Sequence, residues 1–245
     1  MKGLFITFEG TEGSGKSTQI AILTERLMAL GYIVRQLREP GGTLIGEEIR
    51  HTLKHSDGNH AMMAETELLL MNASRAQLVR EIIRPALEKG EIILCDRFYD
   101  STVAYQGHGR GLDFQMVRQL IDCAVGETRP DLTLLLMVPV AVSEARRRTR
   151  LLPGLEIARD RMEEADRGFF ERVEAGYKKL AIEEPGRIKS IDATASLEGV
   201  SGQIWAAVEP LARKLPAPSL PLKKPVVDKV AASATVSAPK KKLSF

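Results

Sequence analysis

The sequence contains very little cysteine and no long apolar run. Cys95 and Cys123 are its only cysteines among 245 residues, so a disulfide framework is excluded, and their spacing is not that of a metal site. The longest apolar run, 132–142, is interrupted by Pro139 and is far shorter than the ~20 residues of a membrane-spanning helix. The apolar run 4–8 is too short for the core of a signal peptide. These absences predict a cytoplasmic protein that makes no use of a membrane.

Positive charge is scarce outside the C-terminal end of the chain. The formal net charge is +3, but the residues from Pro210 onward contain eight basic side chains and only Asp228 as an acid. Residues 1–209 therefore carry a net charge of −4. A domain of this sign is poorly suited to neutralising the phosphates of a duplex, so we expect no nucleic-acid partner.

The segment 213–245 has a composition typical of disorder. It is rich in proline, lysine, alanine and serine, and it holds five of the 12 prolines. It shows no helical or strand periodicity, and it buries too little apolar surface to offset the entropy lost on ordering. We predict one folded domain at 1–212, followed by a disordered tail at 213–245.

Residues 1–209 alternate short apolar runs with longer amphipathic stretches. The runs, typical of strands buried on both faces of a sheet, are 4–9, 33–37, 92–96, 132–138 and 188–192. Helical spacing occurs at 17–30, 44–54, 65–88, 113–125, 142–148, 166–180 and 196–211. Strands that alternate with helices form a parallel sheet through right-handed crossovers. The predicted fold is therefore α/β, with three layers in α/β/α order and a five-stranded parallel sheet.

A glycine-rich loop follows the first predicted strand and precedes the first predicted helix. It reads GTEGSGKS and consists of Gly10, Thr11, Glu12, Gly13, Ser14, Gly15, Lys16 and Ser17. Its glycines allow backbone N–H groups to surround a polyphosphate at the positive end of a helix dipole. We expect Lys16 to reach the β- and γ-phosphates of ATP and the Ser17 hydroxyl to bind Mg²⁺. The alternative is a glycine-rich turn that only begins a helix.

Asp96 ends the third predicted strand, which reads IILCD. In a parallel sheet this carboxylate lies at the same edge as the glycine-rich loop, where it can hold Mg²⁺ directly or through water. We therefore predict Ser17 and Asp96 as the metal site, with Mg²⁺ accompanying ATP. The alternative for Asp96 is a cap of the next helix, and Cys95 is interpreted as a small core residue.

Two arginines follow neighbouring strand ends, where an acceptor binds in this topology. Arg38 begins the turn REPGGT, and Arg97 follows Asp96. A guanidinium group binds a phosphate through two parallel hydrogen bonds, so the two together indicate an acceptor that is itself a phosphate. Each arginine alone would be interpreted as part of a surface ion pair.

Several segments resemble, in order and spacing, those of the bacterial thymidylate kinases. Besides the glycine-rich loop and REPGGT, they are LLLMNASRAQLV (68–79), DRFYDSTVAYQG (96–107), PDLTLLLMVP (130–139), DRME (160–163), FFERVEAGY (169–177) and IDAT (191–194). The resemblance extends over residues 3–209 and implies the P-loop fold of a nucleoside monophosphate kinase, with a basic lid at about 143–163. It also implies a homodimer that transfers the γ-phosphoryl group of ATP to dTMP, giving dTDP and ADP in the synthesis of dTTP.

The resemblance implies roles for five residues of the acceptor site. Arg38 and Arg97 should hold the dTMP phosphate, and Arg75 should donate a hydrogen bond to a thymine carbonyl. Gln106 should contact the base or the sugar. Tyr105 should lie against the deoxyribose face, where a ribose 2′-hydroxyl would clash.

The resemblance also places Glu12 and Met71 at the acceptor. Glu12 occupies the position of a carboxylate that contacts the acceptor sugar or its magnesium surroundings. Met71 occupies the position where the family usually has a phenylalanine stacked on thymine. A thioether can pack against the base but cannot stack on it.

The predicted reaction needs stabilisation of the transferring phosphoryl group rather than a general base. The second pKa of a nucleoside monophosphate is near ~6, so its oxygen is already a nucleophile at neutral pH. An arginine at the phosphoryl group is worth ~10³–10⁵ in rate, and the bacterial family type supplies it from the lid. Arginines precede DRME at 146, 147, 148, 150 and 159, the alternative being a solvated helix end. The predicted catalytic residues are Lys16, Arg97, Arg148 and Arg150.

Two other functions are considered. A nucleotide-dependent switch would read guanine with an Asn-Lys-x-Asp element, but Asn59 and Asn72, the only asparagines, are followed by His60 and Ala73. A kinase for another nucleoside monophosphate would share the loop and the sheet and would differ in its acceptor pocket.

Overall fold

A single sheet of five parallel strands forms the centre of the molecule. The computed structural model describes residues 3–56, 58–150 and 166–216, with the backbone alone for 147–150. The strands are β1 (Leu4–Glu9), β2 (Val34–Arg38), β3 (Ile92–Asp96), β4 (Leu132–Met137) and β5 (Ile188–Asp192). They lie in the order β2-β3-β1-β4-β5. The predicted five-stranded parallel sheet is confirmed, and every strand begins and ends within one residue of its predicted position.

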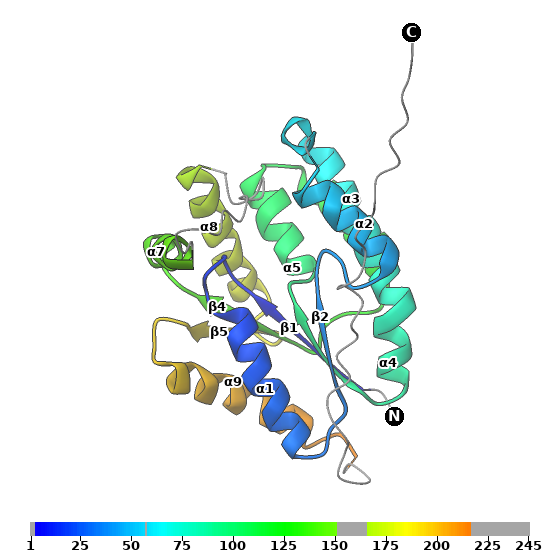
Figure 1. Ribbon diagram of the computed structural model, residues 1–245, viewed down its shortest axis with the longest axis vertical. Coiled ribbons are helices and arrows are strands. Elements are labelled where there is room, and N and C mark those ends of the chain that lie inside the picture. The colour runs from blue at the N-terminus through cyan, green and yellow to red at the C-terminus, as the bar shows by residue number, and fades with distance from the viewer. Residues whose placement is uncertain (1–2, 57, 151–165, 217–245) are drawn as a thin grey trace, which may run out of the picture.

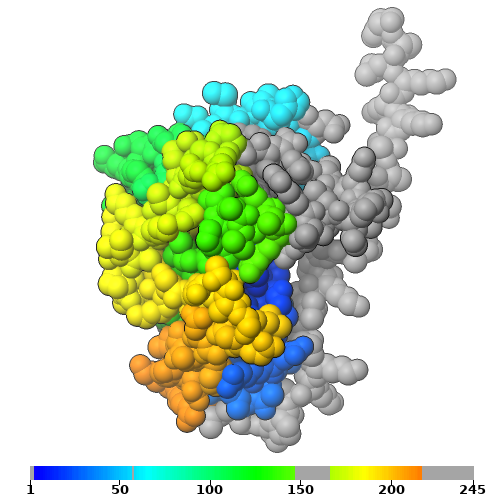
Figure 2. Space-filling model, turned by 90° about the vertical axis from the view of Figure 1, so that its left-hand side faces the viewer, coloured from blue at the N-terminus to red at the C-terminus, as the bar shows by residue number. Residues whose placement is uncertain are grey.

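Helices cover both faces of this sheet (Figure 1). On one face, α1 (Lys16–Ala29) and α9 (Leu197–Ala212) pack side by side. The opposite face is covered by α3 (Ala64–Leu78), α4 (Arg84–Glu88), α5 (Tyr99–Thr102), α6 (Phe114–Val125) and α8 (Arg167–Glu183). α2 (Leu44–Lys54) packs on α3, and a short 3₁₀ turn, Asn59–Ala61, lies between them in the chain. α7 (Val140–Arg150) packs on α8, at the flank that Figure 2 shows with α7 in green and α8 in yellow.

Alternating side chains of the central strands fill two cores, one on each face. Ile6 and Phe8 of β1 pack towards α1 and α9, whereas Phe5 packs towards the layer that contains α3 and α8. The largely apolar runs of β1, β3 and β4 follow from this burial on both faces. The same expectation was wrong for β2 and β5, which are only partly buried, because they form the two edges of the sheet.

The predicted helix 65–88 is divided in the structure. α3 passes into a π-helical segment, Val79–Ile83, before α4 begins. Pro85 lies in the first turn of α4. It has no N–H to donate, and its ring crowds the preceding turn, so a wider turn just before it relieves the clash.

A second π-helical segment, Val103–Gly109, follows α5 and was not predicted. It packs closely on α8, because Gly109 leaves room for an aromatic ring. A Cβ atom at Gly109 would lie 2.6 Å from Cε2 of Phe169. The close approach brings the side chains of α8 next to the end of β3.

The register of the sheet places three chain segments at one edge. Phe8 of β1 pairs with Asp96 of β3, and Arg38 of β2 pairs with the same residue from the other side. Just beyond the strands, the Arg97 N–H donates to the Phe8 carbonyl over 2.9 Å and the Glu39 N–H to the Asp96 carbonyl over 2.9 Å. The glycine-rich loop and both predicted acceptor turns therefore begin at the same edge of the sheet, at the carboxyl ends of their strands.

Two predicted segments lie mostly outside the described residues. The lid predicted at about 143–163 begins on α7, and 151–165 lie outside. The tail predicted at 213–245 is described only to 216, so the domain boundary at 212 stays a prediction. Within the described ranges, no helix combines the length and the apolar character needed to cross a membrane.

Truncation of a buried leucine of α1 tests the packing of this helix. Leu27 has no exposed surface, whereas Leu30, at the end of the same helix, is 52% exposed. We expect Leu27→Ala to lower the free energy of unfolding by about 2–5 kcal/mol, because it removes buried methyl groups and leaves a cavity. Leu30→Ala is the control and should cost about 1 kcal/mol or less. Urea denaturation measures both, and equal losses would contradict the packing.

Candidate active site

The glycine-rich loop has the backbone geometry of an anion cradle. Gly10, Gly13 and Gly15 have φ angles of 131°, 79° and 95°, which lie in the region that favours glycine. The loop leads directly into the N-terminus of α1, where N–H groups and the helix dipole favour an anion. A Cβ atom at Gly10 would lie 2.4 Å from the Leu136 carbonyl oxygen, so this glycine also permits close contact with β4.

Lys16 folds back over this loop. Its Nζ donates to the carbonyl oxygens of Gly10 and Thr11 over 3.1 and 3.0 Å. Burial lowers the pKa of Lys16 to about 8, and the neighbouring Arg97 acts in the same direction. The ammonium group is therefore held at the loop with incomplete charge compensation, which suits it to a polyphosphate.

Ser17 and Asp96, the predicted metal site, are in hydrogen-bond contact. The Ser17 hydroxyl donates to Asp96 Oδ2 over 3.1 Å, and Asp96 Oδ1 is buried without a hydrogen-bond partner. No group of three or more histidine, cysteine, aspartate or glutamate side chains forms a metal cluster in the described residues. A hydroxyl and one carboxylate with a spare oxygen fit Mg²⁺, which takes few protein ligands and completes its shell with phosphate and water.

Two adjoining cavities open at this edge of the sheet. The loop cavity is lined by Gly13, Gly15, Lys16, Ser17, Arg38, Arg50 and Asp96. The inner cavity is lined by Pro40, Met71, Ser101, Thr102, Tyr105 and Gln106. Both share Glu12, Glu39, Lys54 and Arg97. The two cavities therefore meet at four charged residues.

Buried polar atoms without partners concentrate here. Among the described residues, five buried side-chain oxygens lack a hydrogen-bond partner, and four of them belong to residues at this edge: Thr11 Oγ1, Ser14 Oγ, Glu39 Oε1 and Asp96 Oδ1. Such atoms cost free energy unless a ligand or an ion satisfies them. Their convergence indicates a site built for a polar ligand.

Arg38 lines the loop cavity but is paired with a carboxylate. Its Nη2 donates to both oxygens of Glu47 over 3.0 and 2.9 Å, and its Nη1 donates to the Pro40 carbonyl over 3.1 Å. Glu47 also accepts from the Gly42 N–H over 2.7 Å. A phosphate at Arg38 would share this guanidinium group with Glu47.

Arg97 lies in the walls of both cavities, as its predicted role requires. Its φ of 70° is the only positive φ of a non-glycine residue in the described chain. Nη1 donates to Ser101 over 3.2 Å, and Nη2 donates to the Tyr105 hydroxyl over 3.2 Å. The strained backbone and these contacts hold the guanidinium group between the two spaces.

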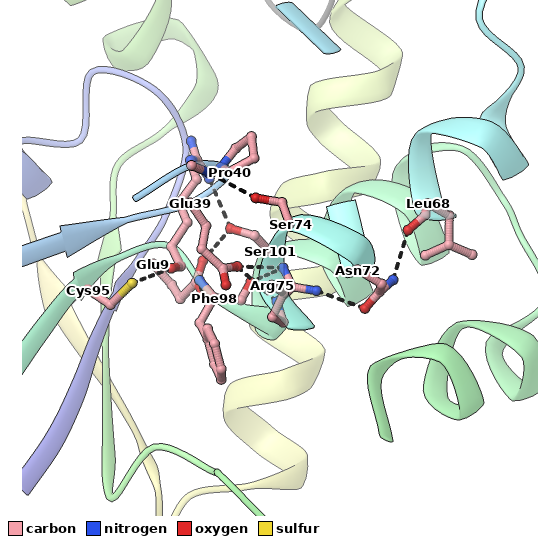
Figure 3. A network of polar contacts seen from close by, with 12 residues as sticks. Glu9, Glu39, Pro40, Leu68, Asn72, Ser74, Arg75, Cys95, Phe98 and Ser101 are labelled. Atoms are coloured by element: carbon pink, nitrogen blue, oxygen red, sulfur yellow. Dashed lines mark hydrogen bonds and ion pairs between the residues drawn. The ribbon is translucent and has the colours of Figure 1, made fainter. Parts of the chain in front are cut away.

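Arg75 is not among the residues that line the inner cavity, and Figure 3 shows it between Glu39 and Asn72. It is 2% exposed, and its guanidinium group donates to Glu39 Oε2, to Asn72 Oδ1 and to the Phe98 carbonyl. Its distance to the nearer Glu39 oxygen is 2.7 Å. Arg75 is absent from the residues that line the inner cavity, so its predicted contact with a base stays a prediction. What it does in this structure is support Glu39.

Glu39 was missed by the sequence analysis as a functional residue. It lines both cavities, and burial raises its pKa to about 7 although Arg75 opposes the shift. Its position beside Arg38 in the turn REPGGT was the available signal. Thr102 and Lys54 were missed as well. Thr102 lies within DRFYDSTVAYQG, whereas nothing in the sequence singles out Lys54 at the end of α2.

Met71, Tyr105 and Gln106 all line the inner cavity, and their contacts with dTMP stay a prediction. The Gln106 amide Nε2 donates to Glu67 Oε1 over 2.7 Å. Because a carboxylate oxygen accepts hydrogen bonds, the Gln106 amide is oriented with its nitrogen towards Glu67. Glu67 also accepts from Arg110 over 3.1 Å.

The start of α7 contacts the glycine-rich loop. The Ser143 hydroxyl donates to the Glu12 carbonyl over 2.6 Å. Arg146 donates to the Gly13 carbonyl over 3.4 Å and to the Ala193 carbonyl over 3.1 Å. The side chains of Arg148 and Arg150 lie outside the described residues, so their predicted catalytic role stays a prediction.

A glycine-rich anion cradle, a hydroxyl–carboxylate pair and a second basic cavity meet at one edge of a parallel α/β sheet. This combination defines a P-loop phosphotransferase of the nucleoside monophosphate kinase type. The comparisons with known proteins narrow the class. A sequence model of the family described as thymidylate kinase matches residues 8–204, and the chain belongs to this family.

Relatives of the chain share most of its length. It is 49% identical over 201 residues to a thymidylate kinase of Syntrophotalea carbinolica, which covers 82% of this chain and 93% of the relative. It is 47% identical over 209 residues to one of Alcanivorax borkumensis, with 85% and 97% covered. A crystal structure of thymidylate kinase from Ehrlichia chaffeensis superposes with a TM-score of 0.66 at 32% identity, covering 85% of this chain and 99% of that one.

The buried Glu9 gives the stability of the protein a specific pH dependence. Burial, with Asp100 adding to it, raises the pKa of Glu9 to about 7 from 4.5. Between these two values the folded state keeps a proton that the unfolded chain has released, so stability falls as the pH rises from 4.5 to 7, by about 3 kcal/mol in total. Glu9→Gln cannot titrate, and we expect it to remove this share of the fall, whereas Glu39, whose pKa burial also raises to about 7, keeps its own share.

Urea denaturation at pH 5, 6, 7 and 8 measures the effect. The matched control is Glu198→Gln, because Glu198 is exposed, and its profile should follow that of the wild type. A Glu9→Gln profile parallel to the wild type would contradict the burial of an uncompensated carboxyl group at this position.

Proposed function

We propose that the protein transfers the γ-phosphoryl group of ATP to dTMP, giving dTDP and ADP for the supply of dTTP. The observation that carries this proposal is the junction of the two cavities at Arg97 and Glu39. One cavity has an anion cradle and the other is partly apolar, so two phosphorylated ligands can meet head to head between them. Membership of the thymidylate kinase family supports the choice of acceptor.

ATP binds on the loop side in this proposal. The N–H groups of residues 10–17 surround its phosphates, and Lys16 moves from the loop carbonyls to the β- and γ-phosphate oxygens. Mg²⁺, when bound, neutralises charge on those oxygens. Ser17 and Asp96 would hold it, because Asp96 Oδ1 is buried without a partner.

dTMP binds on the inner side. Arg97, with Arg38 beside it, holds the acceptor phosphate, and Glu12 lies between the two cavities near the sugar. Met71 packs against the base, Tyr105 against the deoxyribose, and Gln106 at the far wall. Arg75 can donate to the base only if part of its guanidinium group leaves Glu39 or Asn72, to which it donates in this structure. No general base is needed, because the phosphate oxygen is already ionised at neutral pH.

The lid and the tail complete the proposal for the chain. Arg148 and Arg150 bring positive charge to the transferring phosphoryl group, while 1–212 forms the kinase domain and 213–245 a disordered tail. We place the reaction in the cytoplasm, where ATP is available. The protein binds no nucleic acid in this account.

We further propose that the protein is a homodimer. Several large apolar side chains are exposed on α2 and α3 and on the segment between them, namely Leu44, Ile45, Met63 and Leu69, with exposed fractions of 53–74%. Exposed apolar side chains on one helix pair fit a protein interface. Sedimentation velocity supports the homodimer if it gives twice the 27.0 kDa mass of the chain, and a monomer contradicts it.

The test of the proposed function is ADP formation with ATP, Mg²⁺ and a panel of nucleoside monophosphates. We expect dTMP to stimulate ADP formation far more than dUMP, CMP, AMP or GMP. Strong preference for another monophosphate would assign a different kinase. No stimulation by any acceptor would favour a nucleotide-dependent switch.

Met71 is the position at which we expect a change to improve binding. Met71→Phe places an aromatic ring against the base, and stacking of an aromatic side chain on a base is worth about 1–3 kcal/mol. Because Met71 already packs against the base, only part of this energy is gained, and the KM for dTMP should fall about 3–10-fold at a similar kcat. Met63→Phe is the control, because Met63 is 68% exposed. Unchanged or weakened dTMP binding in Met71→Phe would show that Met71 is not under the base.

A further inference from the structure

Three hydroxyl groups hold the guanidinium group of Arg97. Nη1 donates to Ser101 Oγ over 3.2 Å and to the Tyr177 hydroxyl over 3.4 Å, while Nη2 donates to the Tyr105 hydroxyl over 3.2 Å. Tyr105 is part of the inner cavity, but Tyr177 lines neither cavity. Any effect of Tyr177 on a ligand must therefore pass through another residue.

The directions of these hydrogen bonds are set by Glu9 at the end of β1. The Ser101 hydroxyl donates to Glu9 Oε2 over 2.6 Å, and the Tyr177 hydroxyl donates to the same oxygen over 2.8 Å. Each hydroxyl has one proton, so both protons are committed to Glu9. The lone pairs of the two oxygens are then directed to Arg97.

Glu9 itself is held rigidly. It has no exposed surface, and its Oε1 accepts from the Phe98 N–H over 2.7 Å. Figure 3 shows Glu9, at the end of β1, near Phe98 and Ser101. Tyr177 is 2% exposed, and its ring packs edge-on against Tyr105 at 6.3 Å. Three elements distant in the chain, β1, α5 and α8, thus converge on one guanidinium group.

We propose that Glu9, Ser101 and Tyr177 form a buried hydrogen-bond relay that orients Arg97 towards the acceptor phosphate, with Tyr177 as a positioning residue. The inference rests on the proposed function for the identity of the acceptor. The relay fixes the Ser101 and Tyr177 hydroxyl oxygens that accept from Nη1. Because Arg97 is already held in one orientation, its side chain loses less conformational entropy when it binds the phosphate. The relay acts on the phosphate and leaves the base and the sugar alone.

The test is Tyr177→Phe, assayed at pH 8, where Glu9 is ionised. Hydrogen bonds to a charged group are the stronger ones, so we expect the KM for dTMP to rise about 10-fold. The KM for ATP should stay within twofold. The Ki of thymidine, which has the same base and sugar without the phosphate, should also stay within twofold, which a general loosening of the site would not allow.

Tyr32→Phe is the matched control. Its hydroxyl donates to the Ala212 carbonyl over 2.9 Å, far from the site, so it removes a similar bond and should leave all three constants unchanged. Thermal denaturation of both variants checks that they fold. If Tyr177→Phe does not fold, Ser101→Ala takes its place with the same expected result.

A double-mutant cycle separates positioning from direct contact. In the Arg97→Ala background, Tyr177→Phe should have no further effect on dTMP binding, because the group that it positions is absent. An additive effect, an unchanged KM for dTMP, or equal weakening of dTMP and thymidine would each overturn the relay. If the panel assigns another acceptor, the proposed function fails, and the relay is judged with that monophosphate and its nucleoside.

Discussion

The parallel pairing of β1 with β3 is the constraint on which the site depends. It sets Phe8 opposite Asp96. The glycine-rich loop and the Arg97 turn therefore leave the sheet side by side at the same edge. Ser17 then reaches Asp96, and the Phe98 N–H reaches Glu9. A slip of one residue would turn every side chain of the strand to the opposite face and would separate both pairs.

Around this edge of the sheet, the fold buries ionisable side chains whose pKa values are shifted towards their neutral forms. Burial raises the pKa of Glu9 and of Glu39 to about 7 and lowers that of Lys16 to about 8. Several buried oxygens next to them have no partner among the described residues. Both features cost stability in the free protein, and nucleotides that satisfy them would stabilise it by mass action. The site is thus organised for charged ligands before they arrive.

The sequence was sufficient to predict the sheet, the loop and the pair of Ser17 and Asp96, because these depend on local pattern and on the rule that parallel strands end at one edge. It was not sufficient for interactions that depend on packing. Tyr177 meets Glu9 across 168 positions of the chain, and only the close contact of α8 with the segment 103–109 brings them together. The pairing of Arg38 with Glu47 and the burial of Arg75 behind Glu39 likewise follow from helix positions that periodicity does not give.

The central claim is that the phosphates of two nucleotides meet between the glycine-rich loop and Arg97. A crystal structure with dTMP and a non-hydrolysable ATP analogue tests it most directly, through the distance from the acceptor phosphate oxygen to the γ-phosphorus. The account predicts about 3–3.5 Å, the separation of reacting atoms poised for transfer, with Arg97 on the acceptor phosphate. A second nucleotide bound elsewhere, or Arg97 turned away from it, would contradict the account.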